Sequence, residues 1–228
     1  MADILSASWK VETRTEFRVL QCRAGVAIVS SIVNFQYFVV AFLVAAMAER
    51  FYERRYSHEA VRGKRKMEWS FAAFHTLHVL IYIITAVEVL WFHRPACWAV
   101  TAVGIALFLV SATVRLIAIR TLGKFWSLHL EIREGHRLVT GGIYQYMRHP
   151  AYAAIMLEVV SIPLVGNAYG ALVIGLGMYI PLLLIRWHRE EREMVSKFGE
   201  QYEQYRREVP AFVPWRGRRP TNDSARTS

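Results

Sequence analysis

Arg186 and Glu190 stand where a long apolar run of the chain gives way to a polar segment. Their i, i+4 spacing places both side chains on one face of a helix, where a plain surface ion pair contributes about 0.2–0.5 kcal/mol. At a membrane boundary an ionisable pair is instead functional by default, because idle charge is costly there. An arginine can hold a carboxylate through two parallel hydrogen bonds, and a glutamate can accept ribose hydroxyls or hold an amine.

A second polar segment, residues 136–152, precedes the same apolar run. Gly141 and Gly142 allow a tight turn that brings backbone groups close to a ligand, although an ordinary loop explains the pair better on its own. Pro150 fixes a helix start and holds His149 extended just before it. A single histidine at such a boundary is more often structural than catalytic. We keep the structural interpretation for His58, His75, His78, His93 and His188.

Five apolar blocks must position these two segments. The chain has 228 residues, 54% of them hydrophobic, and a mean hydropathy of +0.23. The blocks at residues 25–48, 69–92 and 96–119 are each long enough to cross about 30 Å of hydrocarbon. Residues 151–164 and 171–185, joined by an uncharged turn, form a helical hairpin whose arms Pro163 and Pro181 should kink. The sequence therefore predicts an all-α, polytopic membrane protein with about five transmembrane helices.

A helical hairpin returns the chain to the side of the membrane from which it started. The polar segments before and after the hairpin must therefore meet at one membrane face. This places His149 and Tyr152 near Arg186 and Glu190, at the cytoplasmic boundary. The polar stretch that follows, residues 186–219, has a helical apolar stripe that Gly199 interrupts. The stripe consists of Met194, Phe198, Tyr202 and Tyr205, and we interpret its two tyrosines as packing residues.

Basic residues lie almost wholly between the apolar blocks and give the chain a net charge of +10. Residues 49–68 carry seven Lys and Arg, residues 120–150 carry five, and the chain from residue 186 carries ten. The positive-inside rule then predicts that the first connection, the third connection and the C-terminus are cytoplasmic, and five spans place the N-terminus outside. Lys10, Arg14, Arg18 and Arg23 argue mildly against this. An N-terminal interfacial helix or a missed re-entrant segment is the alternative.

Composition and cysteine spacing exclude several other classes of protein. The sequence pI of about 9.9 does not indicate nucleic-acid binding, because no basic stripe lies on a soluble fold. Cys22 and Cys97 lack the spacing of metal ligands, so we expect no metal site. The chain does not open with a cleavable signal peptide, since its first apolar block is too long for one.

The two polar segments carry a resemblance to a known enzyme family. Isoprenylcysteine carboxyl methyltransferases and their prokaryotic relatives are similar over about residues 125–210, in the run HRLVTGGIYQYMRHPAY, a charge-poor hairpin and the run RWHREEREMVSKFGEQYEQYRREVP. The resemblance implies S-adenosylmethionine in a cytosol-facing pocket closed by the C-terminal helix. We accordingly divide the chain into an N-terminal segment with three transmembrane helices at 1–119, a methyltransferase core at 120–219 and a disordered tail at 220–228.

The resemblance also implies roles for single residues. Arg186 would bind the acceptor carboxylate as the catalytic residue, and Glu190 would hold the cofactor. His129 stands where relatives usually carry glutamine, and we keep it as a weaker cofactor contact. The other implied cofactor contacts are His136, Arg137, Leu138, Val139, Tyr144, His149, Pro150, Ala151 and Tyr152.

A carboxylate acceptor needs no general base, because it is already ionised at pH 7 and is itself the nucleophile. Catalysis would come from in-line positioning and the exclusion of water. A lipophilic or prenylated acceptor would enter from the bilayer among membrane lipids, and the cofactor from the cytoplasm. The alternatives are a membrane thiol S- or phospholipid N-methyltransferase, with His149 or Tyr152 as base, and a non-enzymatic membrane protein. Polar groups clustered at one face, apart from His78 and Glu88, weaken the last alternative.

Overall fold

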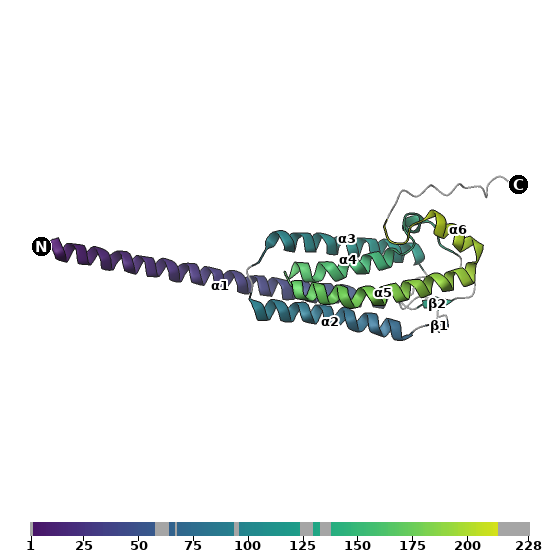
Figure 1. Cartoon of the computed structure of the whole chain (residues 1–228), viewed down its shortest axis with the longest axis horizontal. Helices are drawn as coiled ribbons and strands as arrows, with labels where there is room; N and C mark the ends of the chain where they lie inside the picture. Colours follow the sequence, from purple (N-terminus) through teal and green to yellow (C-terminus); the bar gives the residue numbers. More distant parts are fainter. Residues whose placement is uncertain are drawn as a thin grey trace.

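Helices account for most of the computed structural model, which describes residues 2–57, 64–66, 68–93, 96–123, 130–132 and 138–213, with side chains described within 25–52, 72–93, 96–123 and 138–213. The helices are α1 (Ala2–Ser57), α2 (Glu68–Phe92), α3 (Trp98–Leu122), the 3-10 helix η2 (Gly142–Gln145), α4 (Pro150–Val165), α5 (Tyr169–Phe198) and α6 (Glu200–Glu208). In Figure 1, α2 to α5 lie beside the second half of α1, whose first half projects away from the bundle.

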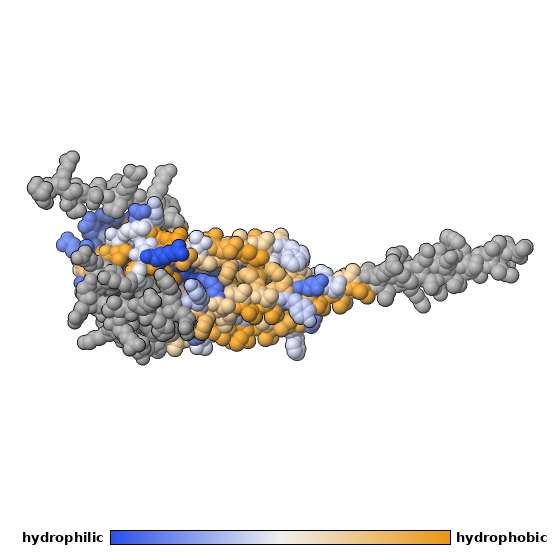
Figure 2. Space-filling view, turned by 180° about the vertical axis from the view of Figure 1, so that it is seen from behind, coloured by the Kyte–Doolittle hydropathy of each residue, from blue (hydrophilic) through white to orange (hydrophobic). Residues whose placement is uncertain are grey.

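Among the described residues, four stretches are long and apolar enough to cross a membrane: Gly25–Tyr52, Ala72–Phe92, Trp98–Leu122 and Tyr169–Phe198. The fifth expected span, α4, has 16 residues and is about 24 Å long at 1.5 Å per residue, which is shorter than the hydrocarbon layer. Large apolar side chains face outward all along the bundle, and Figure 2 shows them as a broad belt between more hydrophilic ends. The prediction of an all-α integral membrane protein is confirmed.

A small antiparallel ribbon is the one departure from helix among the described elements. Strand β1 (Lys64–Lys66) pairs with β2 (Leu130–Ile132), with Lys64 opposite Ile132. The sequence does not predict these strands, because both are short and lie in polar connections. Their pairing places the first and third connections at the same end of the bundle, which is also the end with α6 (Figure 1), as the charge distribution predicts. Which side of the membrane this end faces stays a prediction.

The turn of the predicted hairpin, between α4 and α5, is held against the start of α3. Asn167 adopts a left-handed conformation with φ of 54°, which asparagine tolerates. Its Oδ1 accepts a hydrogen bond from the backbone N–H of Cys97 at 2.9 Å, and its Nδ2 donates to Thr101 Oγ1 at 2.8 Å. A Cβ at Gly104 would lie 2.6 Å from the backbone nitrogen of Val165, so glycine permits this close approach of α3 to the end of α4.

Glu88 of α2 caps the start of α5. Its Oε2 accepts the backbone N–H of Ala171 at 2.7 Å and its Oε1 that of Gly170 at 3.2 Å. These first-turn amides have no partner within their own helix, and a carboxylate there also complements the helix dipole. Pro163 and Pro181 lie inside the continuous helices α4 and α5, and the kinks expected from them stay predictions.

The helical region after the hairpin is interrupted at Gly199, as the sequence predicts. Gly199 has φ of 56°, in the left-handed region that favours glycine, and it separates α5 from α6. The chain after α6 returns to the start of α4, where the backbone N–H groups of Arg148 and His149 donate to the carbonyls of Pro210 and Ala211, both at 2.9 Å. A buried cluster holds α6 in place, built from Tyr202, Tyr205 and Val209 with Leu138, Met194, Val195 and Phe198 around them.

Candidate functional site

Tyr152, in the first turn of α4, connects the two charged residues of α5. Arg186 Nε donates a hydrogen bond to the Tyr152 hydroxyl oxygen at 2.9 Å, and the Tyr152 hydroxyl donates to the carboxylate of Glu190. The guanidinium carbon of Arg186 lies 5.3 Å from the ring centroid of Phe74 and 6.0 Å from that of Tyr152. The two ends of the hairpin therefore bring a carboxylate and a guanidinium to the same hydroxyl, and the guanidinium lies against aromatic faces, which stabilise a cation.

Glu191, the next residue of α5, makes a different set of contacts. Its Oε1 lies 2.7 Å from His149 Nε2, 2.9 Å from the hydroxyl of Tyr202, which donates to it, and 3.4 Å from Nη2 of Arg148. The rings of His149 and Tyr152 stack with centroids 5.5 Å apart. Glu191 thus ties the start of α4 to α6, while Glu190 faces Tyr152.

The loop before α4 is fixed by its own turn and by α6. Gly142 has φ of 60°, and a Cβ there would lie 2.8 Å from Cγ2 of Thr121, so the turn requires glycine. The Tyr205 hydroxyl donates to the carbonyl oxygen of Tyr144 at 2.5 Å. Burial raises the pKa of Tyr144, Tyr202 and Tyr205 well above the ordinary tyrosine value, and the Glu190 charge raises that of Tyr144 further. All three hydroxyls therefore stay protonated donors at neutral pH.

Most of the predicted site residues come together at this end of the bundle. Tyr152 contacts His149, Arg186 and Glu190, as described above. The charge of Glu190 also contributes to the raised pKa of Tyr144. The remaining described residues of the predicted site are Leu138, which packs against α6, half-buried Val139 and Ala151, and Pro150, which is buried in the first turn of α4. His129, His136 and Arg137 lie outside the described residues.

Sequence reasoning missed the polar roles of Glu191, Tyr202 and Tyr205. Both tyrosine rings are buried, which agrees with their interpretation as packing residues. Both hydroxyls also form hydrogen bonds, which that interpretation left out. Glu191 carries no separate signal in the sequence, since only the rotation of α5 about its axis decides which of two adjacent glutamates faces His149. The hydroxyls could have been suspected from their spacing, which places a buried pair of polar atoms on the packing face of α6.

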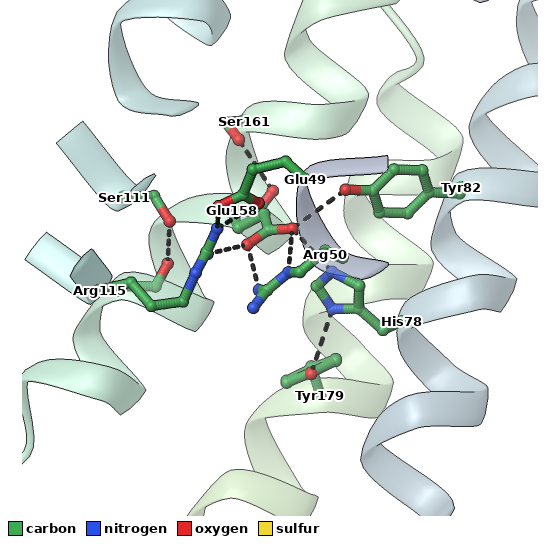
Figure 3. Close-up of polar contacts among 10 residues, drawn as sticks. Glu49, Arg50, His78, Tyr82, Ser111, Arg115, Glu158, Ser161 and Tyr179 are labelled. Carbon is green, nitrogen blue, oxygen red and sulfur yellow. Dashed lines mark hydrogen bonds and ion pairs between the residues drawn. The ribbon is translucent and has the colours of Figure 1, made fainter. Parts of the chain in front are cut away.

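A second polar cluster lies deeper in the bundle around Glu158 (Figure 3). Glu158 is fully buried in α4, and its carboxylate pairs with both Arg50 of α1 and Arg115 of α3, the latter at 2.6 Å. His78 Nε2 lies 2.8 Å from Oε1 of Glu158, and the Tyr82 hydroxyl donates to the same oxygen at 3.0 Å. The interpretation of His78 as a structural histidine fits this position, but the charged cluster around it was not predicted.

The two clusters are connected through aromatic residues. His78 Nδ1 lies 3.4 Å from the hydroxyl of Tyr179, and the Tyr179 ring meets that of Phe74 edge to face with centroids 5.0 Å apart. Phe74 in turn faces the guanidinium of Arg186. The deep cluster therefore supports the wall against which Arg186 is held.

The residues at the site suit a cofactor with both a cation and hydroxyls. Glu190 offers carboxylate oxygens for an ammonium group or ribose hydroxyls. Arg186, on the same face of α5, offers a fork that matches a carboxylate. Within the described residues, no group of His, Cys, Asp and Glu is arranged to hold a metal ion.

Comparison with known proteins confirms the resemblance on which these roles depend. The profile of the isoprenylcysteine carboxyl methyltransferase (ICMT) family matches residues 103–196. The chain is 28% identical over 164 residues to protein-S-isoprenylcysteine O-methyltransferase B of Arabidopsis thaliana, covering 68% of this chain and 83% of that protein. It is also 28% identical over 161 residues to the uncharacterized protein YpbQ of Bacillus subtilis, covering 68% of this chain and 94% of that one.

A solved structure has a similar fold over part of this chain. The eukaryotic intramembrane Ras methyltransferase ICMT superposes with a TM-score of 0.52 and 22% identity, covering 62% of this chain and 52% of that one. At this identity the likeness concerns the fold alone. The sequence matches support a methyltransferase, and the region matched by the family profile begins within α3 and includes both arms of the hairpin.

Proposed function

We propose that this chain, whose residues 103–196 match the isoprenylcysteine carboxyl methyltransferase family, is an S-adenosylmethionine-dependent membrane methyltransferase. Its acceptor is a carboxylate on a lipophilic molecule, such as a C-terminal prenylcysteine. The observation that carries the proposal is the convergence of Arg186 and Glu190 on the hydroxyl of Tyr152 at the open end of the hairpin.

Each charged residue has one partner in the proposed reaction. Arg186 holds the acceptor carboxylate, because its guanidinium is fixed over Phe74 and Tyr152 next to the apolar part of α5. Glu190 holds the cofactor, one helical turn further from the membrane. The cofactor contacts on the other side are Leu138, Val139, Tyr144, His149, Pro150, Ala151 and Tyr152, together with His129, His136 and Arg137 outside the described residues.

The proposed reaction requires these residues to position the reactants and does not require them to transfer a proton. When bound, S-adenosylmethionine supplies a methyl group on a positively charged sulfur, which an ionised carboxylate can attack without a base. Arg186 must align one carboxylate oxygen with that methyl group while leaving its lone pair free. The buried rings of Tyr152 and Phe74 exclude water from the approach, and exclusion of water strengthens the attraction between acceptor and sulfonium.

The position of the site explains why this chemistry takes place in a membrane. Arg186 follows the apolar stretch 169–185, so a lipid-borne acceptor reaches it from the bilayer, while a water-soluble cofactor reaches Glu190 from the cytoplasm. In this proposal residues 120–219 form the catalytic core, residues 1–119 anchor it, and the end of the bundle with α6 faces the cytoplasm.

The test is methyl transfer by the purified full-length chain in detergent. Isotopically labelled S-adenosylmethionine is incubated with a prenylcysteine and with a matched prenylcysteine amide that lacks the carboxylate. We expect label only in the free acid, in a form that mild base releases, since a methyl ester is hydrolysed. Transfer of a base-stable methyl group to a thiol or an amine would contradict the carboxylate acceptor, and failure to bind the cofactor would contradict the enzyme itself.

A further inference from the structure

A cavity opens between α5, α6 and the loop before α4. Its volume is about 550 Å³, which is in the range of pockets that hold small molecules. Three arginines, Arg148, Arg192 and Arg206, line it together with two glutamates, Glu191 and Glu203. The site residues Tyr152, Arg186 and Glu190 do not line it, although Glu191 in its wall contacts His149 of the proposed cofactor site.

Arg148 is buried in the wall of this cavity with much of its hydrogen-bonding capacity unused. Its side chain is 7% exposed, and its Nη2 lies 3.4 Å from Oε1 of Glu191. In the part of the chain that the structure describes, Nε and Nη1 of Arg148 have no hydrogen-bond partner, and neither has the indole Nε1 of Trp187 in the same wall. Glu191 contacts Arg148 through Nη2, and the same Oε1 also accepts a hydrogen bond from Tyr202 and contacts His149.

The unused groups define the chemistry of a ligand. All three nitrogen atoms carry N–H groups, and a buried donor without an acceptor is costly. The guanidinium adds a full positive charge and presents its donors in a planar fork that matches phosphate or carboxylate oxygens. The complement of Arg148 and Trp187 is therefore an oxyanion with at least two acceptor oxygens.

The depth of the cavity indicates where such an oxyanion comes from. Trp187 follows the apolar stretch 169–185 almost directly, and tryptophans at the ends of membrane spans are typically found among lipid headgroups. Arg192 and Arg206 are exposed at the rim, where basic side chains attract anionic lipids. We propose that this cavity binds the phosphate of an anionic membrane lipid, with Arg148 and Trp187 as its donors. The carboxylate of S-adenosylmethionine has the same chemistry, and the experiment distinguishes the two sources.

The test uses the full-length chain in a neutral detergent and a short-chain phosphatidylglycerol as probe, titrated by calorimetry against short-chain phosphatidylcholine and S-adenosylmethionine. We expect wild type to prefer phosphatidylglycerol. Arg148→Gln should weaken its binding by about tenfold or more, since it removes charge-assisted hydrogen bonds. Trp187→Phe, which keeps an aromatic ring but loses one donor, should weaken it a few-fold. Arg189→Gln removes the same charge from an exposed position outside the cavity and should change nothing.

Three results would overturn the proposal. Equal affinity of wild type for the two lipids would show that no anionic headgroup is selected. Equal losses of phosphatidylglycerol affinity in Arg148→Gln and Arg189→Gln would show that the lipid responds to the overall charge of the protein and not to this cavity. Weaker S-adenosylmethionine binding with unchanged lipid binding in Arg148→Gln would assign the oxyanion to the cofactor. If Arg148→Gln is not monodisperse, Trp187→Phe decides, because unchanged phosphatidylglycerol affinity in that variant also rejects the site.

Discussion

At the scale of single residues, the hydroxyl of Tyr152 couples the proposed acceptor residue to the proposed cofactor residue. It accepts a hydrogen bond from Arg186 and donates one to Glu190, so the two side chains share an anchor although they bind different ligands. A change at either charged residue should therefore affect mainly its own ligand, provided that Tyr152 still holds the other. This separation is what distinguishes a binding site from an ion pair that only stabilises a helix.

Substitutions at Arg186 and at Glu190 should affect different ligands, the acceptor in the first case and the cofactor in the second. Arg186→Ala should lower kcat/KM for a carboxylate acceptor by about 10- to 100-fold, the loss of a charge-assisted bidentate contact, with nearly unchanged cofactor Kd. Arg186→Lys should restore part of the activity, because an ammonium cannot reproduce the fork. Glu190→Gln should weaken cofactor binding first. The measurements are cofactor Kd, acceptor KM and Tm on each variant, and equal losses of both affinities would remove Arg186 from the acceptor site.

The neighbouring glutamates should differ in their effect on stability. Glu191 is buried and accepts from Tyr202 beside His149, so Glu191→Gln loses charge-assisted hydrogen bonds worth about 1.5–3 kcal/mol each. Glu190 is half-buried and should be far less important for folding. We expect Glu191→Gln to lower Tm by several degrees in detergent and Glu190→Gln to leave it nearly unchanged. A larger loss of Tm in Glu190→Gln would reverse the two assignments.

The meeting of His149 and Tyr152 with α5 could be predicted from the sequence, because a charge-poor helical hairpin returns its two flanking segments to the same membrane face. The roles of Glu190 and Glu191 could not be separated, since they depend on the rotation of α5. The partners of Glu158 were also hidden, because they come from distant parts of the chain: Arg50 follows the first apolar block, His78 and Tyr82 lie in the second, and Arg115 lies in the third. A charged residue inside the short arm of the hairpin was the signal that some partner must exist.

At the scale of helices, Glu158 joins four elements of the bundle at one carboxylate. Arg50, His78 with Tyr82, and Arg115 reach it from α1, α2 and α3 (Figure 3). Apolar helices in lipid have no strong preference for one register over another, and polar contacts between helices supply one. The cluster thereby fixes how α4 sits against its neighbours, and so fixes Tyr152 at its start.

Removal of the central charge should destabilise the whole bundle. Glu158→Gln removes the fully buried carboxylate charge on which Arg50 and Arg115 converge, and breaking a buried ion pair in this way costs about 3–5 kcal/mol. Glu49→Gln is the matched control, because Glu49 also pairs with Arg115, at 2.6 Å, but its side chain is 40% exposed. We expect a large fall in Tm for the first variant and a small one for the second. Similar Tm values for Glu158→Gln and wild type would show that the cluster does not hold the helices.

The contact of α3 with the end of α4 should tolerate no added methyl group. A Cβ at Gly104 would lie 2.6 Å from the backbone of Val165, so Gly104→Ala must move one helix, at a cost of about 1–3 kcal/mol. Gly177→Ala is the control, because its added Cβ meets no atom within 4 Å and alanine favours helix. The first variant should lower Tm and the second should keep or raise it. An unchanged Tm in Gly104→Ala would mean that the hairpin is packed more loosely than the structure shows.

At the scale of the whole molecule, the long helices and their connections divide the protein into two polar ends and an apolar belt (Figure 2). The proposed site, α6 and the β1–β2 ribbon share one end, while the start of α3 and the turn between α4 and α5 share the other (Figure 1). The apolar blocks and the charge bias predicted this division, since both follow from composition. The ribbon and the extension of α1 beyond its apolar block were not predicted. Both are built from polar segments whose residues indicate no single structure.

Orientation across the membrane is the last prediction, and the native cysteine at position 97 reports it. Cys97 is exposed at the start of α3, at the end of the bundle opposite the proposed site. If the basic connections are cytoplasmic, Cys97 lies on the side of the membrane that faces away from the cytoplasm. A membrane-impermeant maleimide should then label Cys97 of a Cys22→Ser variant in intact cells. Gly141→Cys, exposed in the loop before α4, should in a background without both native cysteines react only after the cells are permeabilised. A reporter fused to the N-terminus should agree with Cys97, because an odd number of crossings separates it from α6. The reverse labelling would place the proposed site outside the cell, away from S-adenosylmethionine, and would contradict both the orientation and the reaction.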